Sequence, residues 1–226
     1  MSSSRSPGMR FPKVYAVVAA VVAAIVGMTT WAWAGTTTGA EPRPPAPAQA
    51  NGGRVTAPLR AEHRELLPKI EALASAAEAV GTAPPQEQRK KVDESYAFLT
   101  RELIPHAVAE DEVLYAKVDS LIGTADRTRP TDTMRRDHAE VVALTEDLGR
   151  LRDRLRAGTL HPADQKELRR VLYALNAVVD LHFAKEEEVY LPLLDRRLTA
   201  EEARRMFERM DRIAEEETAG AGAARH

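Results

Sequence analysis

The sequence contains no cysteine among its 226 residues. Disulfide bonds, iron–sulfur clusters and thiolate zinc sites are therefore excluded, and any bound metal ion must be held by nitrogen and oxygen. Aromatic residues make up only 5% of the chain, and the Val/Ile/Thr alternation that is typical of β-strands is missing. These absences predict an all-α fold.

An excess of positive charge is also missing, because 32 Lys and Arg residues stand against 34 Asp and Glu residues. Residues 1–34 contain Arg5, Arg10 and Lys13 but no acid, so the remainder is mildly acidic. Its charges are interleaved and form none of the basic patches that mark nucleic-acid-binding proteins. We therefore expect no nucleic-acid partner.

Only one long apolar run is present, Val14–Ala34, which is uncharged over 21 residues and follows a basic N-terminus. Its length is sufficient for a membrane-spanning helix. The run also ends in Ala32-Trp33-Ala34, the small-x-small form of a signal-peptide cleavage site. We predict that residues 1–34 are a signal anchor, or alternatively a signal peptide cleaved after Ala34. Both interpretations place the remaining chain outside the cytoplasm.

The rest of the chain divides into a linker, a helical domain and a tail. Residues 35–58 contain five prolines among Ala, Thr and Gly, which predicts an extended linker. Residues 59–195 are predicted to form an up-down-up-down four-helix bundle, with helices over residues 59–80, 86–120, 130–158 and 161–194. Pro105 should bend the second of them. Residues 196–226 are predicted to form a short helix, Ala200–Glu216, opened by a Thr199–Glu202 capping box, and a disordered tail.

A histidine and a glutamate, His182 and Glu186, interrupt an apolar stripe of the predicted fourth helix. The stripe has the spacing of one inward helix face. It consists of Leu175, Val179, His182, Glu186, Val189 and Leu193. An imidazole and a carboxylate are costly to bury without partners, and a metal ion would supply them.

The same pair recurs at His106 and Glu110, and each pair follows a further histidine. His63 precedes His106 by 43 residues, and His138 precedes His182 by 44. This indicates a duplicated two-helix unit whose polar residues meet at one level of an antiparallel bundle. The predicted metal ligands are His63, His106, Glu110, His138, His182 and Glu186.

Four imidazoles and two carboxylates exceed the needs of one tetrahedral zinc ion and suit two octahedral ions. Iron or manganese is favoured by this ligand count, and a zinc pair is the alternative. Neighbouring polar residues are expected to be bystanders. Asp111, Glu112, Glu187 and Glu188 should be solvated charges, Tyr96, Tyr115 and Tyr190 should pack in the core, and His161 and His226 should bind no metal.

The predicted second and fourth helices contain the segments IPHAVAEDEVLY and LHFAKEEEVYLPLL. With these segments and the six predicted ligands, the chain resembles the hemerythrin-like (HHE cation-binding) family over about residues 57–195. The resemblance implies a four-helix bundle with a non-haem di-iron centre, bridged by oxygen and carboxylates, that reacts with O2. Val142 stands where oxygen-carrying members have a second histidine, and Glu186 where they have aspartate. The pattern resembles the bacterial and iron-sensing branches, and Val142 should leave a coordination position open.

The leading hypothesis is an exported, non-enzymatic di-iron protein that binds O2 or senses oxygen or iron. A di-iron enzyme that handles peroxide or nitric oxide is the first alternative, and the open position at Val142 motivates it. A bundle that buffers metal or docks a protein partner is the second. The expected ligands of the metal pair are O2, another diatomic molecule or peroxide.

Overall fold

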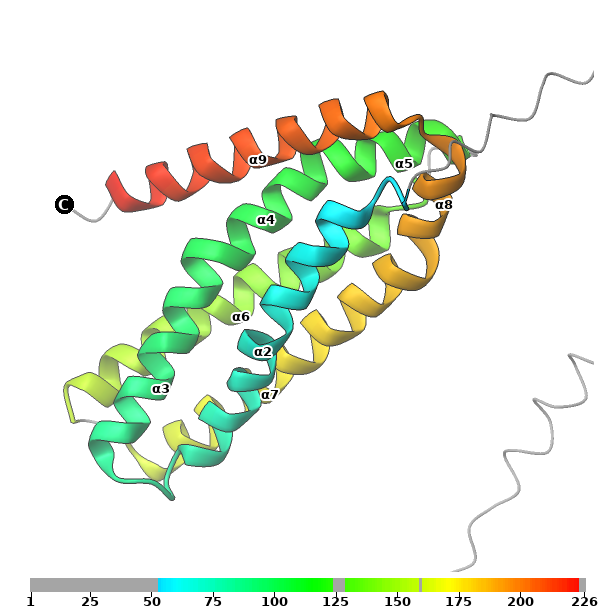
Figure 1. Cartoon of the computed structure of the whole chain (residues 1–226). Helices are drawn as coiled ribbons and strands as arrows, with labels where there is room; N and C mark the ends of the chain where they lie inside the picture. The colour runs from blue at the N-terminus through cyan, green and yellow to red at the C-terminus, as the bar shows by residue number, and fades with distance from the viewer. Residues whose placement is uncertain (1–52, 124–128, 159, 224–226) are drawn as a thin grey trace, which may run out of the picture. The chain divides into compact units, whose positions relative to one another are not determined.

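The computed structural model describes residues 53–123, 129–158 and 160–223, and every element in these ranges is helical (Figure 1). This confirms the predicted all-α class. The hydrophobic helix predicted within residues 14–34, most of the linker and His226 lie outside the described residues. Within the described ranges, no helix combines the length and the apolar character that a membrane crossing requires.

Four long helical stretches run side by side, and successive stretches run in opposite directions (Figure 1). The first is α2 (Ala57–Ala79), which packs against α3 and α7, and the third is α6 (Asp132–Arg156), which packs against the same two helices. The second comprises α3 (Pro85–Phe98), η1 (Leu99–Leu103), α4 (Ile104–Ala109), η2 (Glu110–Leu114) and α5 (Tyr115–Ile122). The fourth comprises α7 (Pro162–Lys185), η3 (Glu186–Tyr190) and α8 (Leu191–Arg197).

Glycines in the left-handed conformation follow the first three stretches. Gly81, Gly123 and Gly158 have φ values of 79°, 85° and 71°. Residues with a Cβ rarely adopt this conformation, which ends a helix and reverses the chain. The helix ends predicted at these glycines therefore agree with the structure to within a few residues.

The apolar core forms two clusters that flank the predicted ligand layer. One cluster includes Leu66 and extends toward the α2–α3 turn, and the other includes Leu59 and extends toward α8. His63 lies between these two leucines in the sequence. His106 and His138 likewise lie between members of the two clusters, and Tyr190 of the second cluster follows His182. The polar layer is therefore sealed by packed side chains at both ends.

Two of the three π-helical segments begin at the predicted glutamate ligands, η2 at Glu110 and η3 at Glu186. A π turn holds one residue more than an α turn, so the inward face shifts by one residue beyond it. Val189, predicted to face inward, is 56% exposed, whereas Tyr190 and Leu191 are buried. The prediction for Val189 was wrong because α-helical periodicity does not continue through η3.

The third π turn, η1, ends at Leu103, two residues before Pro105. Proline lacks an N–H, and its ring keeps the carbonyl of Arg101, four residues earlier, out of the helical ladder. That carbonyl accepts a hydrogen bond from the hydroxyl of Thr218 at 3.3 Å. The carbonyl of Arg101 thus provides an attachment point for the C-terminal helix, and the bend predicted at Pro105 stays a prediction.

The C-terminal helix α9 (Ala200–Ala223) is longer than predicted and extends seven residues beyond Glu216. It starts with the predicted capping box, in which Glu202 N–H donates to Thr199 Oγ1 at 3.2 Å and Thr199 N–H donates to Glu202 Oε2 at 3.0 Å. The helix lies along α4, η1 and η2 (Figure 1). Burial of Met206, Phe207 and Met210 stabilises it, so it does not depend on helix propensity alone.

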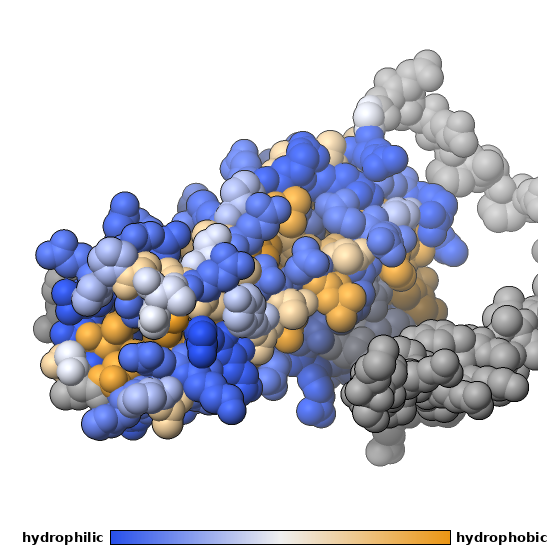
Figure 2. Space-filling view, turned by 90° about the horizontal axis from the view of Figure 1, so that it is seen from below, coloured by the Kyte–Doolittle hydropathy of each residue, from blue (hydrophilic) through white to orange (hydrophobic). Residues whose placement is uncertain are grey.

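The face shown in Figure 2 is mainly hydrophilic, and the hydrophobic residues on it form separate patches. Single exposed apolar side chains are ordinary on a protein surface. Leu181 of α7, which is 59% exposed, is one of those in the described chain. We assign no partner to this surface.

Candidate metal centre

The structure brings the six predicted ligands together in the interior. They project from all four stretches of the bundle, and their exposed fractions lie between 0% and 7%. The residues are His63 of α2, His106 of α4, Glu110 of η2, His138 of α6, His182 of α7 and Glu186 of η3. Side chains that lie up to 123 positions apart in the sequence thus share one buried layer.

The carboxylate of Glu110 faces two pairs of histidines. Its Oε1 lies 3.0 Å from Nε2 of His106 and 3.8 Å from Nε2 of His63. Its Oε2 lies 3.4 Å from Nε2 of His138 and 3.8 Å from Nε2 of His182. These atoms form two groups that can each hold a metal ion, and Glu110 belongs to both.

Glu186 spans the same two groups. Its Oε2 lies 3.5 Å from Nε2 of His63, and its Oε1 lies 3.7 Å from Nε2 of His182. Each group therefore has two imidazole nitrogens and access to an oxygen of each glutamate. Nitrogen and oxygen donors in these numbers match the preferences of first-row divalent metals.

Several donor atoms in this layer are buried without a hydrogen-bond partner. They are Nε2 of His63 and His106, both carboxylate oxygens of Glu110, and Oε2 of Glu186. The 3.0 Å approach of His106 to Glu110 lacks the alignment of a hydrogen bond. Buried polar atoms of this kind are costly unless something satisfies them. Metal ions would satisfy all of them at once, so the residues fit a metal centre.

Each of the four histidines has a carboxylate at its Nδ1 atom. The distances are 3.0 Å for His63 to Glu187, 2.9 Å for His106 to Glu62, 3.0 Å for His138 to Asp111 and 3.2 Å for His182 to Asp137. When Nδ1–H donates to the carboxylate, the lone pair of Nε2 is directed into the layer. This selects the tautomer that binds metal and holds each ring in place.

The four carboxylates follow the internal duplication. Glu62 and Asp137, each just before the first histidine of a repeat, contact the second histidine of the same repeat. Asp111 and Glu187, each just after the glutamate of a repeat, contact the first histidine of the other repeat. The two halves of the centre are therefore joined by reciprocal contacts.

Two of the expected bystanders are thus part of the centre. Asp111 and Glu187 were predicted to be solvated charges, and this was wrong, whereas Glu112 and Glu188 are exposed as predicted. An acid occurs at corresponding positions in both repeats, and this was the signal available in the sequence.

A protein-family model matches the part of the chain that contains this centre. The family model described as the hemerythrin HHE cation binding domain matches residues 54–194, more than half of the chain. The chain belongs to the hemerythrin HHE family. No curated protein and no solved structure matches it. Helix α9 lies beyond the matched residues, so the HHE domain carries an additional helix here.

Tyr115 also belongs to the HHE centre, although the sequence predicts only that it packs in the core. Its hydroxyl donates to Glu186 Oε1 at 2.6 Å and lies 3.0 Å from Nε2 of His182. Burial, together with the charges of Glu110 and Glu186, raises the pKa of Tyr115 far above its usual value, so the phenol keeps its proton. Tyr115 packs in the second core cluster as expected, and the contact of its hydroxyl with the centre was not expected. Tyr115 follows η2, whose extra residue changes the inward positions beyond Glu110.

The other two tyrosines and His161 lie outside the ligand layer. Tyr190 donates from its hydroxyl to the carbonyl of Pro130 at 3.1 Å, and Tyr96 packs against the first core cluster. His161 precedes α7, where its backbone N–H donates to Asp164. These three residues have the structural positions that the sequence predicts.

The ionisable groups of the centre shift one another's pKa values. Burial lowers the pKa of His138, but the contacts with Asp111 and Glu110 outweigh it and raise that pKa to about 9. Burial and the charge of Glu110 raise the pKa of Glu186 to about 7. Burial raises the pKa of Glu110, but His106 and other histidines outweigh this and hold it well below the usual range. In the metal-free protein at neutral pH, the imidazole of His138 therefore carries a proton beside the ionised carboxylate of Glu110.

A small cavity of about 10 Å³ adjoins the layer, roughly the space of one water molecule. Histidine and glutamate ligands form one side, and apolar side chains form the other. The residues are His106, Glu110, His138, His182, Leu103, Ala107, Val141, Val179 and Phe183. Val142 is not among them and is 39% exposed. The neighbouring Val141 borders the cavity instead, and the open coordination position stays a prediction.

The carboxylates at Nδ1 lead to a first prediction. Asp111→Asn should weaken iron(II) binding by about 10- to 100-fold, because loss of the ionised partner releases the His138 ring and its tautomer. The matched control is Glu112→Gln, which removes the same charge from the adjacent, exposed position. Anaerobic competition with a chelator of known affinity measures both. Equal affinities in the two variants would show that Asp111 plays no part in metal binding.

Proposed function

We propose that the HHE domain holds two iron ions and uses them to bind O2 or to sense oxygen or iron. The observation that carries the proposal is Glu110, a fully buried carboxylate whose two unpartnered oxygens face separate histidine pairs. His63 and His106 would hold one ion, and His138 and His182 the other, with Glu186 available to both. Bound iron would supply a redox-active centre with affinity for small oxygen species.

The chain's own residues prepare this centre in three ways. Carboxylates on Nδ1 hold the imidazole rings, so little reorganisation is needed when metal binds. The apolar side chains around the small cavity exclude bulk water and admit a molecule of diatomic size. Tyr115 keeps a proton 2.6 Å from Glu186, where it can stabilise negative charge in the layer.

Metal analysis with an optical spectrum tests the proposal. The purified aerobic protein should contain about two irons per chain and absorb in the near-ultraviolet and visible range, as iron with nitrogen and oxygen ligands does. Reduction should bleach this absorption, and exposure to O2 should restore it. A colourless, metal-free protein of full stability would contradict the proposal. Two manganese or zinc ions in place of iron would keep the centre and contradict the assignment of iron.

Turnover of peroxide or nitric oxide is a second candidate function, and Tyr115 favours it. Its hydroxyl keeps its proton and donates a hydrogen bond inside the ligand layer, where it would stabilise the negative charge that develops when an added reductant reduces such molecules. The iron-loaded protein should then exceed free iron in turnover, and Tyr115→Phe should lower the rate without removing the metal. Turnover equal to that of free iron would leave binding, sensing or metal buffering as the function.

We also propose that residues 1–34 direct the domain out of the cytoplasm. The basic N-terminus followed by the 21-residue apolar run supports this proposal. Protease added to intact cells or spheroplasts should cleave the domain, and the membrane fraction should retain it when the segment is an anchor. A soluble exported product that begins at Gly35 would indicate the signal peptide instead. A domain protected inside the cells would contradict export.

The pKa shifts predict opposite pH effects on stability and on metal binding. His138 has a folded-state pKa of about 9 against an ordinary 6.5, so its stabilising contribution is complete below pH 6.5 and is lost as the pH rises through 9. Metal affinity should increase over the same range, because protons leave the ligands. The melting temperature of the chelator-treated protein at pH 6.5 and 9 checks the effect on stability. Iron(II) titrations at the same two pH values check the effect on metal affinity. A chelator-treated protein that becomes more stable at pH 9 would contradict the shift.

A further inference from the structure

Glu62 differs from the other three carboxylates at the histidine Nδ1 atoms. Each of the other three has a cationic neighbour, namely Arg60 at Glu187, Lys185 at Asp137 and Arg135 at Asp111. In the described part of the chain, Glu62 has His106 as its ion-pair partner and no Lys or Arg. Its side chain is 47% exposed. One edge of the ligand layer therefore presents to solvent a carboxylate that, among the described residues, has no Lys or Arg partner.

A groove of about 540 Å³ opens at this edge. Its walls are α2, the η1–α4 segment and the C-terminal half of α9, and Glu62 and His106 are among the residues that line it. His106 is only 4% exposed, and its Nε2 is one of the donor atoms without a partner. The groove thus leads from solvent to a candidate ligand of the His63–His106–Glu110 group.

The groove is negatively charged. Besides Glu62, the carboxylates of Glu65, Glu102 and Glu215 line it, while its two cations are Lys69, which pairs with Glu102, and Arg101. Asp211, one helical turn before Glu215 on α9, is affected by the same negative charges. Burial raises the pKa of Asp211, and the charges of Glu62, Glu215 and Glu208 raise it further. Acidic groups gathered in a groove raise the local concentration of cations.

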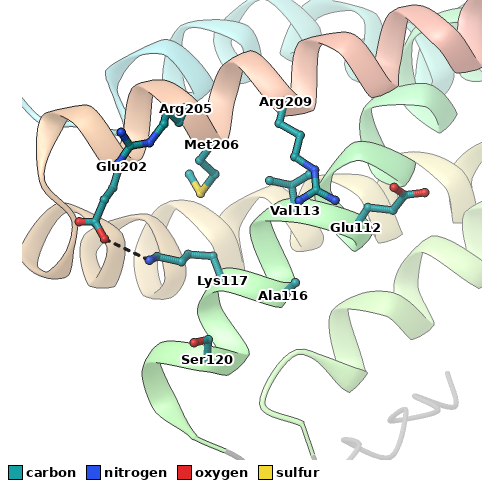
Figure 3. Close-up of a pocket in the computed structure, with 9 residues that line it drawn as sticks. All are labelled: Glu112, Val113, Ala116, Lys117, Ser120, Glu202, Arg205, Met206 and Arg209. Carbon is teal, nitrogen blue, oxygen red and sulfur yellow. Dashed lines mark hydrogen bonds and ion pairs between the residues drawn. The ribbon is translucent and has the colours of Figure 1, made fainter.

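A second groove beside α9 is lined by more cations than carboxylates. It lies between α9 and the η2–α5 segment and has a volume of about 550 Å³ (Figure 3). Lys117, Arg205 and Arg209 line it together with Glu112 and Glu202, and Lys117 pairs with Glu202 at 3.4 Å (Figure 3). None of the six candidate ligands lines this second groove. Of the two grooves, the acidic one alone combines attraction for cations with contact to the centre.

We propose that the groove between α2, α4 and α9 is the route by which a divalent cation reaches the His63–His106–Glu110 group. Asp211 and Glu215 of α9 attract the ion, and Glu62 receives it beside His106. Helix α9 lies beyond the matched HHE domain, so this route is an addition to the domain. The inference rests on the proposed function in that the centre must bind a metal ion.

The rate of iron uptake tests the route. Metal-free full-length protein in detergent is mixed anaerobically with iron(II) at low ionic strength, and unbound iron(II) is trapped at intervals with a colorimetric chelator. The double variant Asp211→Asn/Glu215→Gln should take up iron roughly three- to tenfold more slowly, because steering by charge is lost. Its final iron content should equal that of the unaltered protein, since neither residue belongs to the ligand layer.

The matched control is Glu216→Gln/Glu217→Gln, which removes the same charge from exposed positions of α9 outside the groove. This control should take up iron at the unaltered rate. Added salt should slow the unaltered protein toward the Asp211/Glu215 variant, because it screens the exposed acids. Equal rates in both double variants would overturn the route while the final iron content still supports the centre. An unaltered protein that takes up no iron would overturn the proposed function and the route with it.

Discussion

Glu110→Gln is expected to abolish the binding of both metal ions, whereas loss of a single histidine should weaken one position more than the other. The reason is the shared position of Glu110, whose two oxygens face His63 and His106 on one side and His138 and His182 on the other. Glutamine has the same size but offers one neutral oxygen, so each group loses the charged donor that the two groups share, and the two groups are left with the carboxylate of Glu186 alone. Iron content should fall from about two ions per chain to near zero.

His161→Ala provides the control for this experiment, because His161 lies before α7 and belongs to neither group. Its iron content should be unchanged. Circular dichroism of the metal-free proteins separates loss of ligands from loss of fold. A folded Glu110→Gln protein that retains two irons would refute the assignment of Glu110 as the shared ligand.

Removal of the metal is expected to lower the melting temperature by about 8–16 °C. At an ion concentration of 1,000 times the dissociation constant, binding to the native state contributes about 4 kcal/mol, and each kcal/mol changes the melting temperature by about 2–4 °C in a chain of this size. The stabilisation arises because the ions satisfy buried atoms that are otherwise unpartnered, such as Nε2 of His63 and both oxygens of Glu110. Calorimetry with iron(II) and with chelator measures the difference.

The Glu110→Gln protein supplies the control for this second experiment, since its melting temperature should not respond to iron(II). A response equal to that of the unaltered protein would place the stabilising metal elsewhere. Identical melting temperatures of the unaltered protein with iron(II) and with chelator would mean that the buried donors bind no metal.

Local sequence information was sufficient for the fold class, for most helix ends and for the grouping of the six candidate ligands. Helix periodicity and terminators act within a few residues, so Gly81, Gly123 and Gly158 mark real chain reversals. The duplication adds a second, independent copy of the pattern. His63 and His138 stand at matching distances from His106 and His182, and the structure brings all of them into one layer.

Tertiary structure alone decided which side chains support that layer. The register beyond Glu110 and Glu186 depends on π turns, whose extra residue moves Tyr115 into the centre and turns Val189 out. An α-helical pattern does not anticipate such a turn, because packing against neighbouring helices selects it.

The contacts of Asp111 and Glu187 cross from one repeat to the other, so no spacing within a helix reveals them. The position of α9 also depends on packing, because Met206 and Phe207 are buried only when the helix lies against the second stretch of the bundle. Sequence by itself determined that histidines and glutamates gather on inward helix faces, since burial follows helical period. Only the folded chain decided which acids orient them and where a groove reaches them, because these depend on distances between separate helices.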